Sequence, residues 1–379
     1  MQKKLPHVKN IGNIKGKRVI LRLGLNAAMK DGKVMGGFRI KKVIPTIKFL
    51  KEKGAKVIIL GHMGRDPKQS LRPVADYINR RTKVGFVPYL KGKELPAILE
   101  GQKNGTALIL ENLRSHPGEV KNDPVFAKYL ASLGDIYVND AFPVAHRKHA
   151  SIVGIPKYLP SFIGFQFADE LKHLEMALKP SHPFLFILGG AKPATKMALM
   201  KKFMNIADKI FIGGALANDF YKARGLEVGK SLLDKKAHVG ALAKNKKLIL
   251  PIDVVVKTAH GNRITKPEEV SKGETIADVG PDTIKELKKI IGKAKFVLWN
   301  GPLGNYEEGF EKGTADLLKI LAKSPAKTII GGGDTLAVAF KHKLHNKFNF
   351  VSTAGGAMLD YLADGKLPGI DAIINSKEK

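Results

Sequence analysis

Arginine and histidine recur at the ends of predicted strands in the first half of the chain. The positions are Arg22, Arg39, Arg65, Arg114 and Arg147, with His62, His146 and His149 nearby in sequence. Because the guanidinium fork matches phosphate and carboxylate oxygens, these arginines can converge on one small polyanion. The alternative is that one or two pair with buried acids, which we expect for Arg22 inside its strand. The histidines lack metal-ligand spacing, so no zinc site is predicted.

Glycine-rich turns mark the second half, where each follows an apolar run. They are Gly189-Gly190, Gly213-Gly214, Gly331-Gly332-Gly333 and Gly355-Gly356. Glycine lets backbone N–H groups approach a phosphate, and the N-terminus of a following helix adds a favourable field. A bare tight turn explains any single case equally well, but four in one half predict a shared phosphate-binding edge. None matches the mononucleotide signature GxxxxGK[ST].

Three charged residues lie beside these turns. Asp334 follows the triple glycine, where its carboxylate can hold Mg²⁺ against phosphate oxygens or merely cap a helix. Lys192 and Lys196 flank the start of a predicted helix, and their spacing of four places both on one helical face. They are candidate point-charge clamps on a phosphate, with ordinary surface lysines as the alternative.

The elements that position these residues alternate between strand and helix. Strands are predicted at Arg18–Leu25, Lys56–Gly61, Thr106–Leu110, Asp135–Val138, Phe184–Leu188, Lys209–Ile212, Phe296–Trp299, Thr328–Ile330 and Phe348–Ser352, and helices at Val43–Leu50, Leu71–Arg81, Met197–Ile206 and Leu336–His342. Apolar runs of this kind between helices predict an α/β fold with parallel strands covered on both faces. Ligands are then expected at the carboxyl ends of the strands.

The stretch Phe162–Lys179 separates the two halves. Phe167, Leu171, Leu174 and Leu178 recur at helical spacing, with proline before and after the stretch. Since the two halves carry different chemistry, the stretch is predicted to be a helix joining two lobes; an ordinary surface helix within one domain is the alternative.

Composition narrows the classes of function. A chain of 379 residues with 44% hydrophobic residues favours two folded domains. We expect no membrane span, no signal peptide and, with no cysteine, a cytoplasmic location. The net charge of +31 attracts anions. Its lysines are spread along the chain, without a basic tail or interleaved aromatics, so specific nucleic-acid binding is not predicted.

Eleven motifs, in order along the chain, resemble those of phosphoglycerate kinases. They are LRLGLN (21–26), GHMGR (61–65), LENLRSH (110–116), VNDAFPVAHRKHAS (138–151), LGGAKPATK (188–196), IGGALANDF (212–220), GKSL (229–232), DVGPDT (278–283), WNGPLGNYE (299–307), GGGDT (331–335) and STAGGA (352–357). The likeness runs from about Lys17 to Ile374, so it covers nearly the whole chain.

The resemblance implies two α/β lobes, each with a mainly parallel sheet flanked by helices. Residues 1–161 would bind phosphoglycerate, 162–179 would form the connecting helix, 180–355 would bind nucleotide, and 356–379 would return to the first lobe. The reaction would be phosphoryl transfer between 1,3-bisphosphoglycerate and ADP, giving 3-phosphoglycerate and ATP, in a monomer. Because the acceptor in the reverse direction is an ionised carboxylate, no general base is needed.

Site residues follow from the same resemblance. The substrate residues would be Asn26, Arg39, His62, Arg65, Arg114 and Arg147, and the nucleotide residues Lys196, Gly280, Glu307, Gly332, Gly333, Asp334 and Thr335. Asp334 would hold Mg²⁺. The catalytic residues would be Arg39, Lys192 and Lys196, which would stabilise the phosphoryl group during its transfer.

Several loop positions depart from the family pattern. Gly24 stands where the family has an Asp that bonds the substrate hydroxyl, and the other departures are Gly36, Gly37, Phe38, Pro143, Val144, Thr195, Ala215 and Ala354. The leading hypothesis is therefore phosphoglycerate kinase activity, impaired or intact. A non-catalytic or engineered relative that retains ligand binding is the alternative. A third hypothesis, nucleic-acid binding, is supported only by the net charge.

Overall fold

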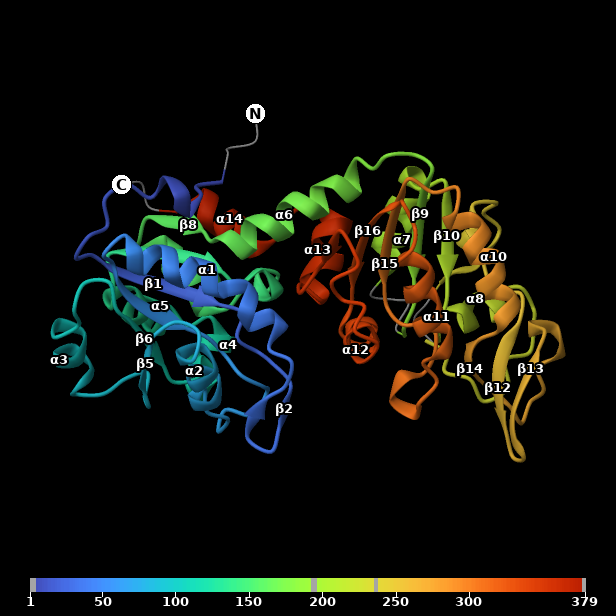
Figure 1. Ribbon diagram of the computed structural model, residues 1–379, viewed down its shortest axis with the longest axis horizontal. Coiled ribbons are helices and arrows are strands. Elements are labelled where there is room, and N and C mark those ends of the chain that lie inside the picture. The colour runs from blue at the N-terminus through green and yellow to red at the C-terminus, as the bar shows by residue number, and fades with distance from the viewer. Residues whose placement is uncertain (1–4, 192–195, 235–237, 377–379) are drawn as a thin grey trace. The chain divides into compact units, whose positions relative to one another are not determined.

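The computed structural model describes residues 5–191, 196–234 and 238–376. The chain forms two units, residues 1–172 with 366–379 (unit 1) and residues 173–365 (unit 2). The division falls within helix α6 (Phe165–Leu178), which therefore belongs to both. Helix α13 (Gly356–Asp364) belongs to unit 2, and the chain returns to unit 1 with α14 (Pro368–Ile374), ten residues later than the boundary at 356 expected from the sequence. Figure 1 shows α14 beside β8.

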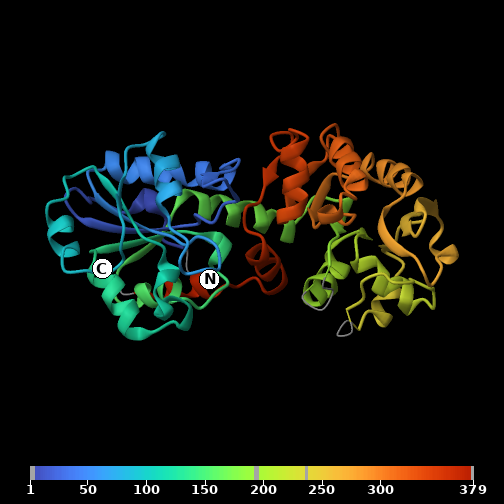
Figure 2. The ribbon, with the colours of Figure 1, turned by 90° about the horizontal axis from the view of Figure 1, so that it is seen from below.

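Unit 1 is built on a six-stranded parallel sheet with the order β5-β6-β4-β1-β7-β8. The strands are β1 (Arg18–Leu23), β4 (Lys56–Leu60), β5 (Gly85–Val87), β6 (Ala107–Leu110), β7 (Ile136–Asp140) and β8 (Ser161–Ile163). The helices are α1 (Phe38–Glu52), α2 (Arg72–Asn79), α3 (Leu95–Glu100), α4 (Pro117–Lys121) and α5 (Pro124–Ser132). Helices lie on both faces of this sheet (Figure 2).

The central strand β1 shows why its sequence is apolar without interruption. Successive side chains of a strand point to opposite faces. Val19 and Leu21 belong to one buried cluster together with Ile40 of α1. Ile20 belongs to a second cluster together with Leu130 of α5. Both faces of the sheet are thus covered, as the unbroken apolar run predicts.

The segment before α6 differs from the sequence prediction. Phe162 and Ile163 are not helical but form the end of β8, parallel to β7. Asp140, at the end of β7, accepts a hydrogen bond from the backbone N–H of Phe167 at 2.8 Å and so caps the first turn of the helix. The helix consequently begins at Phe165, three residues later than predicted. Its core face, which includes Leu174, is buried as predicted.

Unit 2 repeats the architecture with a parallel sheet of order β11-β10-β9-β15-β16-β17. Its strands are β9 (Phe184–Leu188), β10 (Lys209–Ile212), β11 (Leu248–Ile249), β15 (Phe296–Asn300), β16 (Lys327–Gly331) and β17 (Phe350–Val351). The helices, besides α13, are α7 (Met197–Ile206), α8 (Leu216–Ala223), α9 (Gly240–Ala243), α10 (Pro281–Ile291), α11 (Lys312–Leu321) and α12 (Gly333–Lys341). The two parallel sheets confirm the predicted α/β fold class.

Sequence reasoning missed a small antiparallel sheet in unit 2. It has the order β13-β12-β14, formed by β12 (Val254–Thr258), β13 (Gly261–Thr265) and β14 (Thr275–Val279). A two-stranded hairpin, β2 (Met29–Lys30) with β3 (Lys33–Val34), was missed in unit 1. These strands are short and partly exposed, so they lack the long apolar run that revealed the others. Among the described residues, no helix is long and apolar enough to span a membrane.

Candidate functional site

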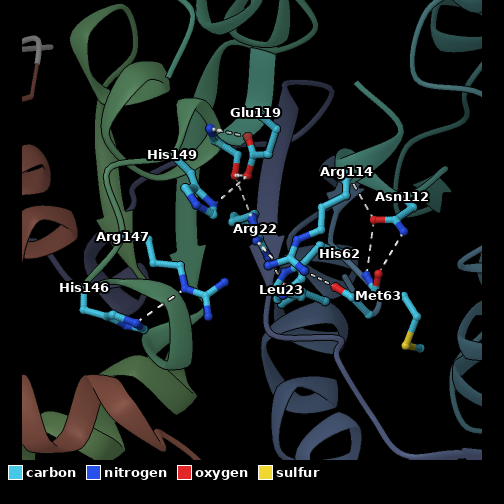
Figure 3. Close-up of polar contacts among 12 residues, drawn as sticks. Arg22, Leu23, His62, Met63, Asn112, Arg114, Glu119, His146, Arg147 and His149 are labelled. Atoms are coloured by element: carbon cyan, nitrogen blue, oxygen red, sulfur yellow. Dashed lines mark hydrogen bonds and ion pairs between the residues drawn. The ribbon is translucent and has the colours of Figure 1, made fainter. Parts of the chain in front are cut away.

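The carboxyl edge of the unit 1 sheet carries a buried arginine bound to a histidine. Arg22, on β1, is fully buried, and its terminal nitrogen lies 3.0 Å from Nδ1 of His62, which follows β4. The same guanidinium donates to the carbonyl of Leu23 and, from Nε, to the hydroxyl of Ser151 at 2.9 Å. Arg22 is therefore a structural member of the edge, as expected, although it bonds a histidine and a serine rather than an acid directly (Figure 3).

A buried acid completes this network. Glu119, on α4, accepts hydrogen bonds from the Ser151 hydroxyl at 2.6 Å and from the Ser151 backbone N–H at 2.9 Å. Burial raises the pKa of Glu119, while the charge of Arg22 opposes that shift. Burial also lowers the pKa of His149 to about 4, so this neighbour, 3.7 Å from the Glu119 carboxylate, is neutral at pH 7. Arg22 is thus the cation that balances Glu119, with Ser151 between them.

Electrostatics keep His62 neutral. Burial is the main cause that lowers its pKa, to about 2, and the positive charges of Arg22, Arg114 and Arg147 add to the effect. Arg114 and Arg147 are only partly buried, and burial and mutual repulsion lower the pKa of Arg114. The edge therefore presents cationic groups around a neutral imidazole, an arrangement suited to a small polyanion.

The loops that carry these side chains are held together by Asn112. This fully buried side chain accepts hydrogen bonds from the backbone N–H groups of Met63 and Arg114, at 3.2 and 3.1 Å. It donates to the carbonyls of Met63 and Gln69, at 3.0 and 2.7 Å. Asn112 fixes the segment after β4 against the segment after β6, so His62 and Arg114 come from loops locked to each other (Figure 3).

The remaining predicted substrate residues lie in the same unit. The Asn26 side chain accepts from the backbone N–H of Gly64 at 3.0 Å, and the Asn26 backbone carbonyl accepts from Arg39 at 2.6 Å. Burial lowers the pKa of Arg39, and Glu170 opposes the shift. Arg65 is exposed, and its charge contributes to the lowered pKa of Arg114. Sequence reasoning did not select Glu119, Ser151 or Asn112, although two quoted motifs, LENLRSH and VNDAFPVAHRKHAS, contain Asn112 and Ser151.

In unit 2 a cavity of about 590 Å³ opens at the carboxyl edge of the sheet. Its wall includes the turns after β9, β10 and β15, part of the antiparallel sheet, and the start of α12; the lining residues used below are Gly190, Gly214, Ala215, Asp278, Glu307 and Asp334. Apolar groups such as Leu232, Val254 and Leu303 also line it. A cavity that combines apolar and polar groups is typical of a small-molecule site.

Glycine in these turns is required by close backbone packing. A Cβ on Gly189 would lie 2.2 Å from the Pro302 carbonyl oxygen, and one on Gly301 2.3 Å from the Gly189 carbonyl oxygen. A Cβ on Gly214 would lie 2.6 Å from the Gly190 backbone nitrogen. Three loops therefore meet backbone to backbone at the cavity. Two of the predicted glycine turns, after β9 and β10, therefore lie side by side, together with Gly301, and close packing is the physical reason for these three glycines. That this edge binds phosphate stays a prediction.

Lys196 and Asp334 are the charged pair beside this edge. Lys196, at the start of α7, is buried and donates to the Gly189 carbonyl at 2.5 Å. Burial lowers its pKa to about 8, and the charge of Asp334 opposes that shift. Asp334 is exposed in the first turn of α12. The Lys196 ammonium can neutralise an anionic ligand, and the Asp334 carboxylate can hold a cation that accompanies it. Lys192 and the departure at Thr195 lie outside the described residues.

The remaining residues predicted to bind the nucleotide differ in how they relate to the cavity. Glu307 is exposed and lines the cavity. Gly332 and Gly333 form the turn into α12, and the buried hydroxyl of Thr335 has no hydrogen-bond partner in the described part of the chain. Gly280 is not among the lining residues: it precedes α10, where a Cβ would lie 2.2 Å from the Asp253 carboxylate. Its glycine is explained by that packing.

No cluster of three or more His, Cys, Asp or Glu side chains suited to a metal occurs among the described residues. The exposed carboxylate of Asp334 at the cavity fits Mg²⁺ that arrives with phosphate oxygens and keeps its waters. The donor set therefore fits a metal–nucleotide complex rather than a protein-only metal site.

Some of the loop departures have local explanations. Gly36 and Gly37 both have positive φ (65° and 61°), and a Cβ on Gly37 would overlap the Tyr77 hydroxyl, so glycine is needed there. Gly24 is not in the left-handed region, and a Cβ there would make ordinary contact, 3.5 Å, with the ring of Pro143. Two of the departures therefore touch each other. Ala215 lines the cavity and Ala354 is buried; nothing in the structure explains these two.

Comparison with known proteins places this geometry in a family. The phosphoglycerate kinase family model matches residues 8–366. Phosphoglycerate kinases of Pseudothermotoga lettingae and Aquifex aeolicus are 42% and 40% identical, each over 97% of this chain and 98% and 97% of their own. The structure of the phosphoglycerate kinase of Coxiella burnetii has a TM-score of 0.82 at 35% identity, covering 98% of this chain and 99% of its own. That of Pyrococcus horikoshii has 0.88 at 31%, covering 97% and 98%. The chain belongs to the phosphoglycerate kinase family.

Proposed function

We propose that this enzyme transfers a phosphoryl group between 1,3-bisphosphoglycerate and ADP, in line, with Mg²⁺ and with closure of the two units. The observation that supports the proposal is the different chemistry of the two sheet edges. One offers arginines around a neutral histidine, and the other a cavity flanked by Lys196 and Asp334. The first suits a small phosphorylated acid, and the second suits a nucleotide.

On the glycerate side, Arg65, Arg114 and Arg147 would bind the phosphate, with His62 donating a hydrogen bond. Asn26 and Arg39, which already bond each other through the Asn26 carbonyl, would hold the glycerate end near the transferred group. Arg39 would also stabilise the charge of that group during transfer. Gly24 offers no side chain to the substrate hydroxyl, so this enzyme is expected to bind its acid substrate more weakly than a form with Asp there.

On the nucleotide side, the cavity would hold the base, Glu307 the ribose, and Lys196 with the turn Gly332–Thr335 the phosphates. Lys192 is proposed as a second cation on the transferred group. Asp334 would hold Mg²⁺, whose chemistry is to neutralise phosphate oxygens. We keep Gly280 as a proposed neighbour of the nucleotide. Its contribution would be indirect, through its packing on Asp253.

Chemistry at the reacting atoms requires no general base. The attacking oxygen belongs either to an ADP phosphate or, in reverse, to an ionised carboxylate. The protein therefore acts by positioning and charge neutralisation. Because the two ligand sites belong to separate units, transfer requires closure that brings the ligands together and excludes water. We expect a cytoplasmic monomer. Light scattering of the purified protein would check the monomeric state.

Formation of ATP from ADP and 1,3-bisphosphoglycerate, followed in a coupled assay, tests the function. Titration calorimetry with ADP, in the presence and absence of Mg²⁺, separates binding from catalysis. Mg-dependent ADP binding without turnover would favour the non-catalytic relative. Neither binding nor turnover at millimolar ligand would reject the proposal.

A further inference from the structure

An unbroken hydrogen-bonded chain runs from the interior of unit 1 to the basic edge. It begins at the Glu119 carboxylate, passes through the Ser151 hydroxyl and the Arg22 guanidinium, and ends at Nδ1 of His62. Each of the four side chains is at most 5% exposed. The chain joins α4, the π-helical turn η4 (Ala150–Gly154), β1 and the loop after β4. Figure 3 shows Glu119, Arg22 and His62 in this order.

The direction of every bond in this chain is set by chemistry. Arginine has only donors, so Arg22 must donate both to Ser151 and to Nδ1 of His62. Since Nδ1 is an acceptor, the proton of the neutral imidazole must be on Nε2. The Ser151 hydroxyl accepts from Arg22 and therefore directs its own proton to Glu119, at 2.6 Å. Within the described residues, Nε2 of His62 has no hydrogen-bond partner and is free to donate to a ligand.

We propose that Glu119 and Ser151 are positioning residues that act through Arg22 to hold His62 as its Nε2–H tautomer, so that His62 donates a hydrogen bond to the phosphorylated acid. The proposal rests on the proposed glycerate site of unit 1 and deepens it. Neither Glu119 nor Ser151 touches the substrate.

The chain does more than satisfy a buried charge. Ser151 also accepts a hydrogen bond on its carbonyl from Tyr137, and its N–H donates to Glu119, so local folding has supports that do not involve the hydroxyl. What the hydroxyl adds is the link to Arg22. Without it, the guanidinium loses one of its three acceptors, and the donor to Nδ1 of His62 is held less firmly. A neutral histidine without that donor can populate either tautomer.

The test reads the tautomer directly and without ligand. Two-bond ¹H–¹⁵N correlation spectra of the histidine side chains, with His62→Gln for assignment, distinguish Nε2–H from Nδ1–H imidazole. The parent is expected to show Nε2–H. Ser151→Ala is expected to show a mixture, together with a roughly three- to tenfold rise in KM for 3-phosphoglycerate, little change in kcat, and an unchanged KM for ATP.

Two variants serve as matched controls. Ser151→Thr keeps the hydroxyl and is expected to retain the Nε2–H tautomer and most of the affinity. Ser161→Ala removes another buried serine hydroxyl of unit 1, which donates to the Leu159 carbonyl at 2.9 Å without any link to His62. It is expected to leave both the tautomer and KM unchanged. If Ser151→Ala fails to fold, Ser151→Cys, with its weaker donor and acceptor, replaces it.

An Nδ1–H imidazole in the parent, or an unchanged tautomer in Ser151→Ala, would overturn the proposal whatever the kinetics. A mixture in Ser151→Ala equally present in Ser161→Ala would also overturn it. If the parent binds no 3-phosphoglycerate at all, the proposed function fails, and the proposal that His62 serves a ligand fails with it. The tautomer spectra then still decide whether the Ser151 hydroxyl orients His62.

Discussion

The two units share an architecture and differ in how they prepare the same edge of it. Each has a six-stranded parallel sheet whose carboxyl ends carry the candidate residues. In unit 1 the edge is built from side chains, with Arg22 bonded to His62 and Asn112 bonded to the backbone of the neighbouring loops. In unit 2 it is built from backbone, with Gly189, Gly214 and Gly301 packed where a Cβ would overlap.

This difference follows from what each edge is proposed to hold. A small, highly charged acid requires several fixed cations, which only side chains supply. A larger ligand with an apolar base requires volume, and loops that pack backbone to backbone leave the cavity open. Tolerance to substitution should therefore differ: unit 2 should be sensitive at glycines, and unit 1 at its buried polar side chains.

The largest expected effect is on the glycine edge. Gly214→Ala combines a positive φ of 62° with a Cβ 2.6 Å from backbone, so we expect it to lower the free energy of unfolding by about 3 kcal/mol. Urea unfolding followed by the fluorescence of Trp299, the only tryptophan and fully buried in unit 2, would measure this. Gly365→Ala is the control, because its φ is also positive (71°) but its Cβ would meet nothing within 4 Å. It should cost about 1 kcal/mol; equal losses would contradict the packing argument.

The second largest effect is expected at Lys196, the buried cation of unit 2. Lys196→Met should reduce kcat/KM for ADP about a hundredfold, since a buried cation near the phosphates is lost. Lys201→Met, on the exposed side of the same helix, is the control and should retain activity.

Because the pKa of Lys196 is lowered to about 8, its ammonium is lost as pH rises, and kcat/KM should fall above about pH 8. Lys196→Arg should shift that fall to higher pH; an unshifted profile would assign it to another group.

A buried acid in unit 1 gives a smaller, pH-dependent effect. Burial raises the pKa of Asp140 to about 7, against hydrogen bonds from Thr46 and Phe167. The folded state then holds a proton that the unfolded state releases near pH 4, so stability falls as pH rises from about 4 to 7. Asp140→Asn should lack this loss and gain about 2 kcal/mol on the parent between pH 5 and pH 8, measured by urea unfolding followed by circular dichroism. A constant difference between the two proteins would show that Asp140 does not titrate in this range.

The smallest effect tests the departure at Gly24. Gly24→Asp should place an acceptor for the substrate hydroxyl beside Asn26 and raise kcat/KM for 3-phosphoglycerate about tenfold. The φ of Gly24 is not in the left-handed region and its Cβ would contact Pro143 at 3.5 Å, so no backbone strain opposes the change. Gly24→Ala should be neutral in both stability and kinetics. If Gly24→Asp behaves like Gly24→Ala, the assignment of the glycerate site to this position is wrong, and the affinity for ADP should be unaffected in either case.

Sequence by itself determined the repeated strands, several of their bounds and the family. Phe184–Leu188, Met197–Ile206 and Lys209–Ile212 were predicted to the residue, because long apolar runs and helical periodicity are local signals. The placement of arginines and glycines at strand ends was equally local. Short strands such as Gly261–Thr265, and the strand that replaces the start of the predicted helix at Phe162, carry no such signal.

Only tertiary structure decided what those strand-end residues do. Arg22 was expected to be structural, and only the fold shows that it bonds His62 and Ser151, which are 40 and 129 positions away in sequence. Glu119 and Asn112 could not be selected because their importance lies in burial and partners that the fold creates. Gly280 and Gly214 look alike in sequence, but one packs on a carboxylate and the other on backbone at a cavity. Residue type fixes which interactions a side chain can make, whereas the fold fixes which partners lie within reach and how much water is excluded.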